Sequence, residues 1–326
     1  MLKQTLKRSN WRRTALVGCF TLLSTSIAAC TSSGAETTTT SPTAETSTDE
    51  TAPVAAVDSA VTAAGQVAST PLKRTYEDFQ QSNFDENSIN VTNKYFPMKP
   101  GTRHEYDGST LEEGKTLSHR VVFTVTNLTK VIQGVNTVVI WERDFSDGEL
   151  EEDELTFFAQ DKLGNVWHLG QYSELWDAKE YTAGRTWFVG HPSDAKAGIM
   201  MKADPKANQP DWSEGYAPPP YFWTDRSRVR AVNQKTTVPA GTFSGVLVTE
   251  EYNEEEPSSK QLKYYAPGVG FVRVGWAGTD ESKETLLMVR TEMLSADKLA
   301  EASAGALELE TRALVYSTAD PSVLRK

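Results

Sequence analysis

The sequence predicts a mainly β protein. We expect a single large antiparallel curved sheet, forming a half-barrel, an open barrel or a sandwich, with a short C-terminal helix. In several segments, apolar residues recur at every second position, as at Val121, Phe123 and Val125, which is the period of a half-buried strand. Turn residues separate these segments at short spacing, and no helical pattern lies between them.

The expected strands follow one another from residue 121 to residue 293. Asp147-Gly148 separates two of them and is a strong hairpin signal, because such turns need positive φ. Leu163-Gly164-Asn165 marks a second turn. The expected strands lie at residues 121–126, 131–133, 137–145, 155–158, 166–169, 185–189, 226–236, 243–252, 260–265, 270–276 and 285–293.

The C-terminal part has a different pattern. Between residues 295 and 316, apolar side chains recur at three- and four-residue steps, which predicts an amphipathic helix. The residues on its apolar face are Leu299, Ala302, Ala306, Leu309 and Ala313. The final ten residues are expected to be disordered, and the proline-rich segment 204–221 is expected to be a long irregular loop. The β domain is therefore expected at residues 73–294, and the helix and tail at 295–326.

Residues 1–29 have the order of a secretory signal. A basic stretch up to Arg13 precedes an apolar stretch at 15–23 and then small residues. The apolar stretch is shorter than the roughly 20 residues that a membrane-spanning helix needs. Ile27-Ala28-Ala29-Cys30 resembles the lipobox of bacterial lipoproteins, which implies cleavage between Ala29 and Cys30 and lipidation of Cys30. An ordinary signal cleaved after Ala29 and an uncleaved anchor are the alternatives.

The segment from Cys30 to Leu72 is expected to be a disordered tether. Its residues are mainly Thr, Ser, Ala and Glu, and the chain has no aromatic residue between Phe20 and Tyr76. Such a composition buries too little apolar surface to offset the entropy cost of ordering. The protein is therefore expected on the extracytoplasmic side, anchored to the bacterial membrane through Cys30, with the β domain at a distance set by the tether.

Five short sequence motifs stand out in the β domain, at residues 93–102, 106–108, 159–167, 238–243 and 263–270. Together they resemble motifs of a group of uncharacterised bacterial, often actinobacterial, secreted lipoproteins. The half of the chain that contains the last two motifs is more distantly similar to curved-sheet envelope proteins of the LolA/LolB type. These resemblances imply an envelope location and a curved antiparallel sheet, and they carry no catalytic residues.

The composition argues against nucleic acid as a partner. The net charge is −11, and it becomes more negative when residues 1–29, with five basic and no acidic side chains, are removed. The segment 108–116 resembles a phosphate loop, but five residues separate its glycines where the motif has four. In the acidic run 144–154, Arg143 and Phe145 stand where a calcium loop needs oxygen ligands, which favours a charged hairpin over a weak cation site.

The residue types needed for catalysis or for metal binding form no recognisable motif. The four histidines lack metal-ligand spacing, and no nucleophile elbow is present. The two cysteines are Cys19 in the signal and Cys30 at the lipidation site, so the folded part is expected to contain no disulfide and no thiolate site. We therefore expect no cofactor, no metal and no enzymatic activity.

Tryptophan is frequent, and its positions suggest two roles. Trp141, Trp167 and Trp276 lie in periodic strands and are expected in the core. A second group surrounds the proline-rich loop and is the candidate binding lip. Its members are Trp212, Tyr216, Tyr221, Phe222 and Trp223.

The leading hypothesis is a non-enzymatic, lipid-anchored envelope protein whose β domain binds a hydrophobic small molecule or an envelope protein. A concave apolar face and the candidate lip would form the binding surface. Two alternatives remain open. In the first, the chain is a structural or adhesion protein that displays its domain. In the second, it is a module that binds or hydrolyses cell-wall glycans through exposed aromatics and two carboxylates.

Overall fold

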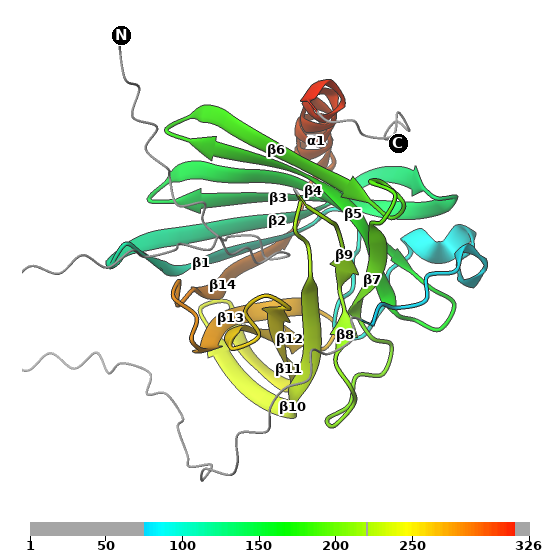
Figure 1. The fold of residues 1–326 in the computed structure, drawn as a ribbon. Helices are drawn as coiled ribbons and strands as arrows, with labels where there is room; N and C mark the ends of the chain where they lie inside the picture. The colour runs from blue at the N-terminus through cyan, green and yellow to red at the C-terminus, as the bar shows by residue number, and fades with distance from the viewer. Residues whose placement is uncertain (1–74, 220, 317–326) are drawn as a thin grey trace, which may run out of the picture. The chain divides into compact units, whose positions relative to one another are not determined.

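The structure is a computed structural model that describes residues 75–219 and 221–316 (Figure 1). The predicted signal at 1–29, its cleavage site at Ala29, the lipidated Cys30, the tether and the final ten residues lie outside the described residues. These predictions remain untested. Within the described part, the prediction of a mainly β fold with one antiparallel sheet and a C-terminal helix is confirmed.

The described chain begins with two short 3₁₀ helices, continues through fourteen strands and ends in one α-helix. The 3₁₀ helices are η1 (Gln81–Asn83) and η2 (Glu86–Ile89), and the α-helix is α1 (Ala296–Tyr316). The first seven strands are β1 (Thr102–Glu112), β2 (Lys115–Ile132), β3 (Val135–Ser146), β4 (Glu149–Gln160), β5 (Val166–Asp177), β6 (Glu180–Phe188) and β7 (Lys196–Met201). The other seven are β8 (Trp212–Ser213), β9 (Gly215–Tyr216), β10 (Asp225–Val238), β11 (Gly241–Asn253), β12 (Ser259–Ala266), β13 (Gly270–Gly278) and β14 (Thr285–Met293).

All fourteen described strands belong to one sheet with the order β8-β10-β11-β12-β13-β14-β1-β2-β3-β4-β5-β7-β9, and β6 pairs with β5 beside this path. Figure 1 shows that β10–β13 curve away from the plane of β2–β6. The predicted hairpin at Asp147-Gly148 joins β3 to β4, and both residues have positive φ, at 46° and 81°. The predicted irregular loop at 204–221 was wrong in part, because it contains β8 and β9.

The concave side of the sheet is filled by side chains of the protein itself. Phe96, in the segment before β1, has its ring 5.7 Å from that of Phe158 on β4 and 5.9 Å from that of Tyr265 on β12. Met98, from the same segment, is also buried in this core. Strands on opposite sides of the curved sheet therefore contact each other through the segment that precedes β1. This apolar core occupies the concave face that was predicted to be a binding surface.

Helix α1 covers the opposite face of the sheet. Ala306, Leu309 and Ala313 are fully buried against Leu155 and Tyr172 of β4 and β5. The predicted apolar face of the helix is thus confirmed, with Leu299 at its partly exposed end. No helix among the described residues combines the length and apolar character needed to span a membrane.

Candidate functional site

One end of the concave interior is polar. Alternation along β3 and β4 places Glu142 and Glu154 opposite each other on the same face as the apolar Ile140. Burial raises the pKa of Glu154 well above its ordinary value, with further contributions from nearby carboxylates. Thr156 and Gln171 donate hydrogen bonds to Glu154 over 2.7 and 3.2 Å. The buried carboxyl is therefore held by partners inside the fold, as stability requires.

His119 carries a positive charge between two buried carboxylates. Its Nε2 lies 2.6 Å from Asp144 Oδ1, and its Nδ1 lies 3.1 Å from Glu284 Oε1. Burial lowers the pKa of His119, but the two carboxylates outweigh this and raise it to about 11. A second buried pair joins Lys263 to Glu251. Both arrangements neutralise charges in the interior, so their role is to stabilise the fold.

The outer face of β1, β2 and β3 carries a cleft of about 510 Å³. Val122 and Phe145 contribute apolar surface, and Arg120 and Arg143 contribute guanidinium groups. Ser118 donates two hydrogen bonds to Asp147 Oδ1, from its backbone N–H over 2.8 Å and from its hydroxyl over 3.1 Å. This contact ties the β3–β4 turn to β2, so the wall of the cleft is fixed by the fold.

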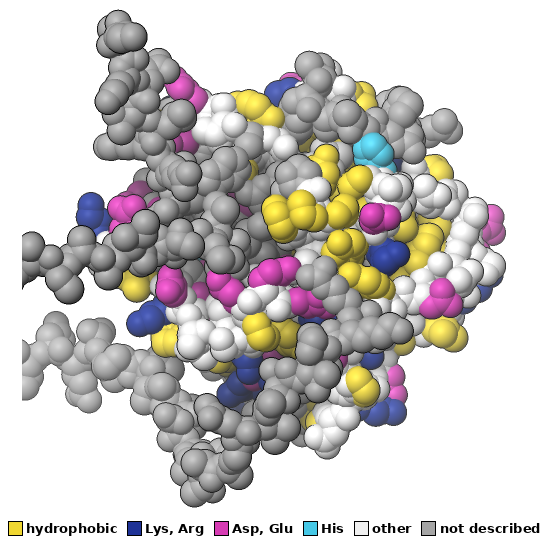
Figure 2. All heavy atoms as spheres, viewed as in Figure 1, with side chains coloured by type: hydrophobic (Ala, Val, Ile, Leu, Met, Phe, Trp, Pro, Cys, Tyr) yellow, Lys and Arg dark blue, Asp and Glu magenta, His cyan; other side chains and the backbone are white. Residues whose placement is uncertain are grey.

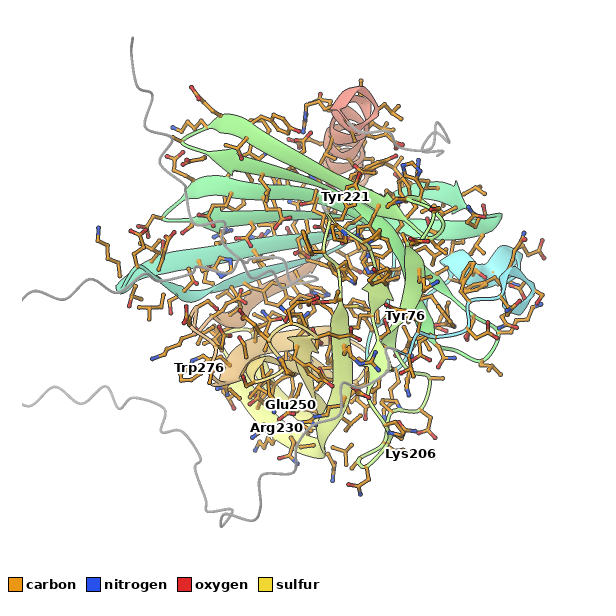
Figure 3. All side chains as sticks on the ribbon, in the orientation of Figure 1. Tyr76, Lys206, Tyr221, Arg230, Glu250 and Trp276 are labelled. Carbon is orange, nitrogen blue, oxygen red and sulfur yellow. The ribbon has the colours of Figure 1, made fainter. Side chains whose placement is uncertain are left out.

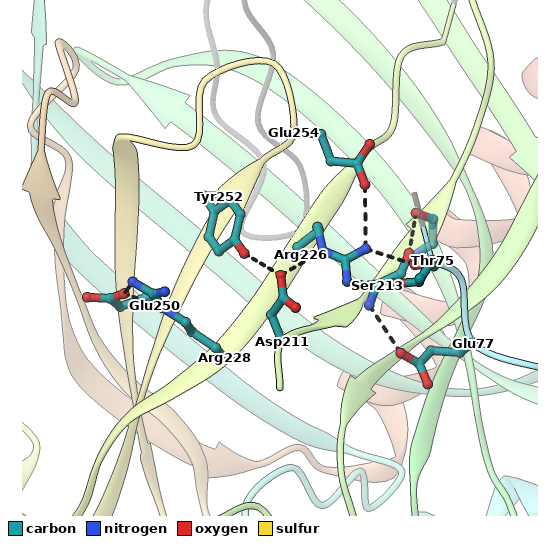
Figure 4. A network of polar contacts seen from close by, with 10 residues as sticks. Thr75, Glu77, Asp211, Ser213, Arg226, Arg228, Glu250, Tyr252 and Glu254 are labelled. Carbon is teal, nitrogen blue, oxygen red and sulfur yellow. Dashed lines mark hydrogen bonds and ion pairs between the residues drawn. The ribbon is translucent and has the colours of Figure 1, made fainter. Parts of the chain in front are cut away.

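A polar network fixes the start of the described chain on the sheet (Figure 4). Arg226 of β10 donates to Asp211 Oδ2 over 2.9 Å and to the carbonyl oxygen of Thr75, also over 2.9 Å. Tyr252 of β11 donates to the same Asp211 oxygen. Burial raises the pKa of Asp211, but the hydrogen bonds from Arg226 and Tyr252 outweigh it and lower the pKa overall. The network therefore attaches the chain at Thr75 to β8, β10 and β11.

A neighbouring cluster on β10, β11 and β12 brings three basic side chains to Glu250. Arg228 donates to Glu250 Oε2 over 2.7 Å, Lys260 lies 3.5 Å from the same atom, and Arg230 pairs with the other oxygen. Figure 3 shows Arg230 and Glu250 side by side. These partners lower the pKa of Glu250 against the opposing effect of burial. The charges of this cluster therefore compensate one another within the protein.

The five residues of the predicted lip do not form one surface. Trp212 and Trp223 are buried, and the ring of Trp223 lies 5.7 Å from that of Trp187 in the core. Tyr216 and Tyr221 are partly exposed, and Phe222 is 47% exposed. Figure 2 shows a group of hydrophobic side chains near β9, mixed with acidic and basic ones. Binding by any of these residues remains a prediction.

The three strand tryptophans predicted in the core also differ from one another. Trp167 is buried, whereas Trp141 is partly buried beneath α1. Trp276 is 40% exposed, so the core prediction was wrong for this residue. The outer cleft was not predicted from the sequence. In the sequence, Arg143 and Phe145 were notable only because they interrupt a calcium-loop pattern. Within residues 75–219 and 221–316, no group of three or more acidic, histidine or cysteine side chains could hold a metal ion.

Comparisons with known proteins add two likenesses. No family model matches this sequence, and no curated protein matches it. A crystal structure from Bacteroides fragilis, provisionally described as an exported protein with a YmcC-like fold, is 13% identical with a TM-score of 0.33, covering 61% of this chain and 99% of that chain. A crystal structure from Parabacteroides distasonis, provisionally described as a lipoprotein, is 11% identical with a TM-score of 0.32, at 61% and 99% coverage. At these values neither likeness assigns a function, and the resemblance to LolA and LolB stays a prediction.

Proposed function

We propose that this chain is a non-enzymatic bacterial envelope lipoprotein, anchored on the extracytoplasmic side through Cys30, whose β domain binds a ligand in the cleft on the outer face of β1–β3. The observation that carries the proposal is the contrast between the two faces of the sheet. Phe96 and Met98 fill the concave side, whereas the outer face keeps a cleft of about 510 Å³. Small-molecule sites typically measure roughly 300–1,000 Å³.

The positions of the histidines support a binding role over catalysis. General acid–base chemistry needs a titratable group within hydrogen-bond reach of the substrate. His104 and His168 are buried in the interior, and the imidazole of His119 has no exposed surface although its residue borders the cleft. His191, which follows β6, does not line the cleft. His119 is also held between two carboxylates, which keeps it charged. The cleft is therefore better suited to holding a molecule than to transferring protons.

Membrane anchoring is tested by replacing the two cysteines separately. Cys30→Ser is expected to abolish lipid labelling and to release the protein from the anchored membrane pool, because the lipid is attached to the Cys30 sulfur. Cys19→Ser, which lies in the predicted signal, is the matched control and should keep both the lipid label and the association with the membrane. Lipid labelling and fractionation of cells measure the result. Unchanged lipid labelling in Cys30→Ser would overturn the anchor.

Ligand binding in the cleft is tested with a photoreactive amino acid in cells. Phe145→p-benzoylphenylalanine places the reactive group in the cleft, and Tyr264→p-benzoylphenylalanine places it on β12, away from the cleft. After irradiation, mass spectrometry should find a small-molecule adduct at position 145 and none at position 264. Absence of an adduct at 145, or equal labelling at both positions, would contradict the proposed function.

A further inference from the structure

The guanidinium of Arg143 is in no close ion pair with a described residue, and the carboxylates of Asp153 and Glu301 act on it only from a longer distance. The group lies 4.4 Å from the ring centre of Trp141 and 5.9 Å from that of Phe145, its neighbours on the same face of β3. It makes no hydrogen bond or ion pair with any residue in the described part of the chain. Because Arg143 is partly buried, its donors lose water without gaining an acceptor, and a half-buried cation in this state has a desolvation cost.

The carboxylate that faces Arg143 is already engaged. Asp153 stands opposite Arg143 in the register of β3 and β4. Its Oδ1 accepts a hydrogen bond from Trp141 Nε1 over 2.6 Å, and its Oδ2 accepts one from Arg312 over 3.3 Å. Asp153 therefore directs both oxygens to other donors, which explains why Arg143 remains unpaired.

The other arginine of the cleft is neutralised. Arg120 lies 2.7 Å from Glu105 Oε2 and 3.5 Å from Asp107 Oδ1. Arg143 has no such contact: Val122 lies across from it on β2, and Arg120 lies across from Phe145. Burial lowers the pKa of Arg143, the carboxylates of Asp153 and Glu301 oppose this effect, and the positive charges of Arg103 and Arg120 add to it. The cleft thus combines one cation that forms no close ion pair with a described residue with the apolar side chains of Val122 and Phe145.

We propose that this cleft binds an oxyanion, a phosphate or a carboxylate, carried on a short apolar group. Arg143 donates hydrogen bonds to the oxyanion, and Val122 and Phe145 contact the apolar part. A guanidinium suits this role because its planar donors match the two oxygens of a phosphate or carboxylate. The inference rests on the proposed function, since it names the class of ligand for the same cleft.

The test uses residues 30–326 with Cys30→Ser, which removes the predicted signal and the predicted lipidation site. Isothermal titration calorimetry compares hexyl phosphate, hexanol and inorganic phosphate. Hexyl phosphate should bind at least about tenfold more tightly than either fragment, because only it offers both the charge and the apolar contact. Equal affinity for hexanol and hexyl phosphate would overturn the role of the oxyanion.

Three variants isolate the guanidinium. Arg143→Gln should weaken binding of hexyl phosphate by about tenfold or more, and Arg143→Lys should weaken it less because the charge remains. Arg273→Gln is the matched control: its guanidinium lies 4.9 Å from the ring centre of Tyr264 on strands outside the cleft, and it should leave the affinity unchanged. Equal loss in Arg143→Gln and Arg273→Gln, or no loss in Arg143→Gln, would overturn the inference.

Vesicles distinguish the two sources of such a ligand. If phosphatidylglycerol vesicles, but not phosphatidylcholine vesicles, bind the protein in an Arg143-dependent way, the oxyanion belongs to a membrane headgroup. If only hexyl phosphate binds in this way, the ligand is a free molecule. A photoadduct at position 145 without Arg143-dependent binding would overturn the inference and leave the proposed function standing. Absence of the photoadduct would overturn the proposed function itself.

Discussion

Charged side chains in the buried parts of the domain are paired, whereas one charged side chain in the outer cleft is not. Beneath α1, Lys130 is fully buried and lies 2.8 Å from Glu310 Oε1. In the interior, His119 is held by two carboxylates. In the cleft, Arg143 forms no hydrogen bond or ion pair with a described residue and lies over the ring of Trp141. The difference indicates that the fold pairs charges where stability requires it and leaves one unpaired where a ligand can reach it.

This comparison also separates the interior carboxylates from the proposed site. Glu142, Glu152 and Glu154 form an acidic group, but they are buried and engaged within the fold. A buried polar network with its partners in place contributes to a unique packing. An acidic group alone therefore gives no reason to infer a ligand, whereas an unpaired guanidinium beside apolar surface does.

The largest effect is expected at the filling of the interior. Phe96→Ala removes a ring that contacts β2, β4 and β12, and it should lower the free energy of unfolding by about 4 kcal/mol through the cavity it leaves. Phe222→Ala is the control, since Phe222 is 47% exposed and its loss should cost less than about 1 kcal/mol. Chemical denaturation measures both. Equal losses would show that the interior is not sealed by Phe96.

The next effect is expected at the ion pair beneath α1. Lys130→Met leaves Glu310 buried without its cation and should lower the free energy of unfolding by about 3 kcal/mol. The double variant Lys130→Met with Glu310→Leu should recover much of this loss, because no uncompensated charge remains. Denaturation curves of the single and double variants give the coupling. A double variant as unstable as Lys130→Met would contradict the pairing argument.

A smaller, pH-dependent effect is expected at His168 in the interior. Burial lowers its pKa from 6.5 to about 3. A lowered pKa means that the unfolded chain takes up the proton first, so the contribution of His168 is complete above pH 6.5 and is lost as the pH falls towards 3. The loss at pH 5 should reach about 2 kcal/mol.

The variant His168→Phe isolates this contribution, because other titrating groups nearby, such as Glu214 with its raised pKa, are common to both proteins. The stability difference between wild type and His168→Phe should shift by about 2 kcal/mol between pH 7.5 and pH 5. Urea denaturation at both values measures it. A difference that does not change with pH would show that His168 is protonated or exposed in the folded state.

The sequence indicated the sheet and the helix because both depend on local periods. Alternation at Val121, Phe123 and Val125 marks β2, and the three- and four-residue steps at Ala306 and Leu309 mark α1. These patterns are short-range and survive without knowledge of the fold. The hairpin at Asp147-Gly148 could be predicted for the same reason, since the type of a turn depends on adjacent residues.

The filled interior and the cleft could not be predicted, because both depend on register between distant segments. Phe96 contacts Tyr265 only when strands from both ends of the chain meet. Arg143 lies just before the acidic run 144–154, and Phe145 lies within it. In the sequence, this run resembles a hairpin exposed to solvent. Their shared cleft appears only once β2 and β3 are aligned with Arg143 across from Val122. The burial of Trp223, a member of the predicted lip, could not be predicted for the same reason, since spacing alone does not show which face a side chain takes.

The smallest effect on stability is expected at Arg143 itself, and it tests the comparison most directly. Arg143→Gln removes no ion pair and relieves a desolvation cost, while it gives up the contact with Trp141, so the free energy of unfolding should change by less than about 0.5 kcal/mol. Arg312→Gln is the matched variant on the same face. Arg312 lies 2.8 Å from Glu174 Oε2, and its loss should cost about 2 kcal/mol because Glu174 is fully buried.

Denaturation of both arginine variants at pH 7.5 decides between two readings of the cleft. A small change in Arg143→Gln together with a large one in Arg312→Gln means that the fold does not depend on the Arg143 charge, which leaves that charge available for a ligand. A loss in Arg143→Gln as large as that in Arg312→Gln would mean that Arg143 is a structural residue. In that case the cleft would no longer differ from the buried parts of the domain, and the charge of Arg143 would give no reason to infer a ligand.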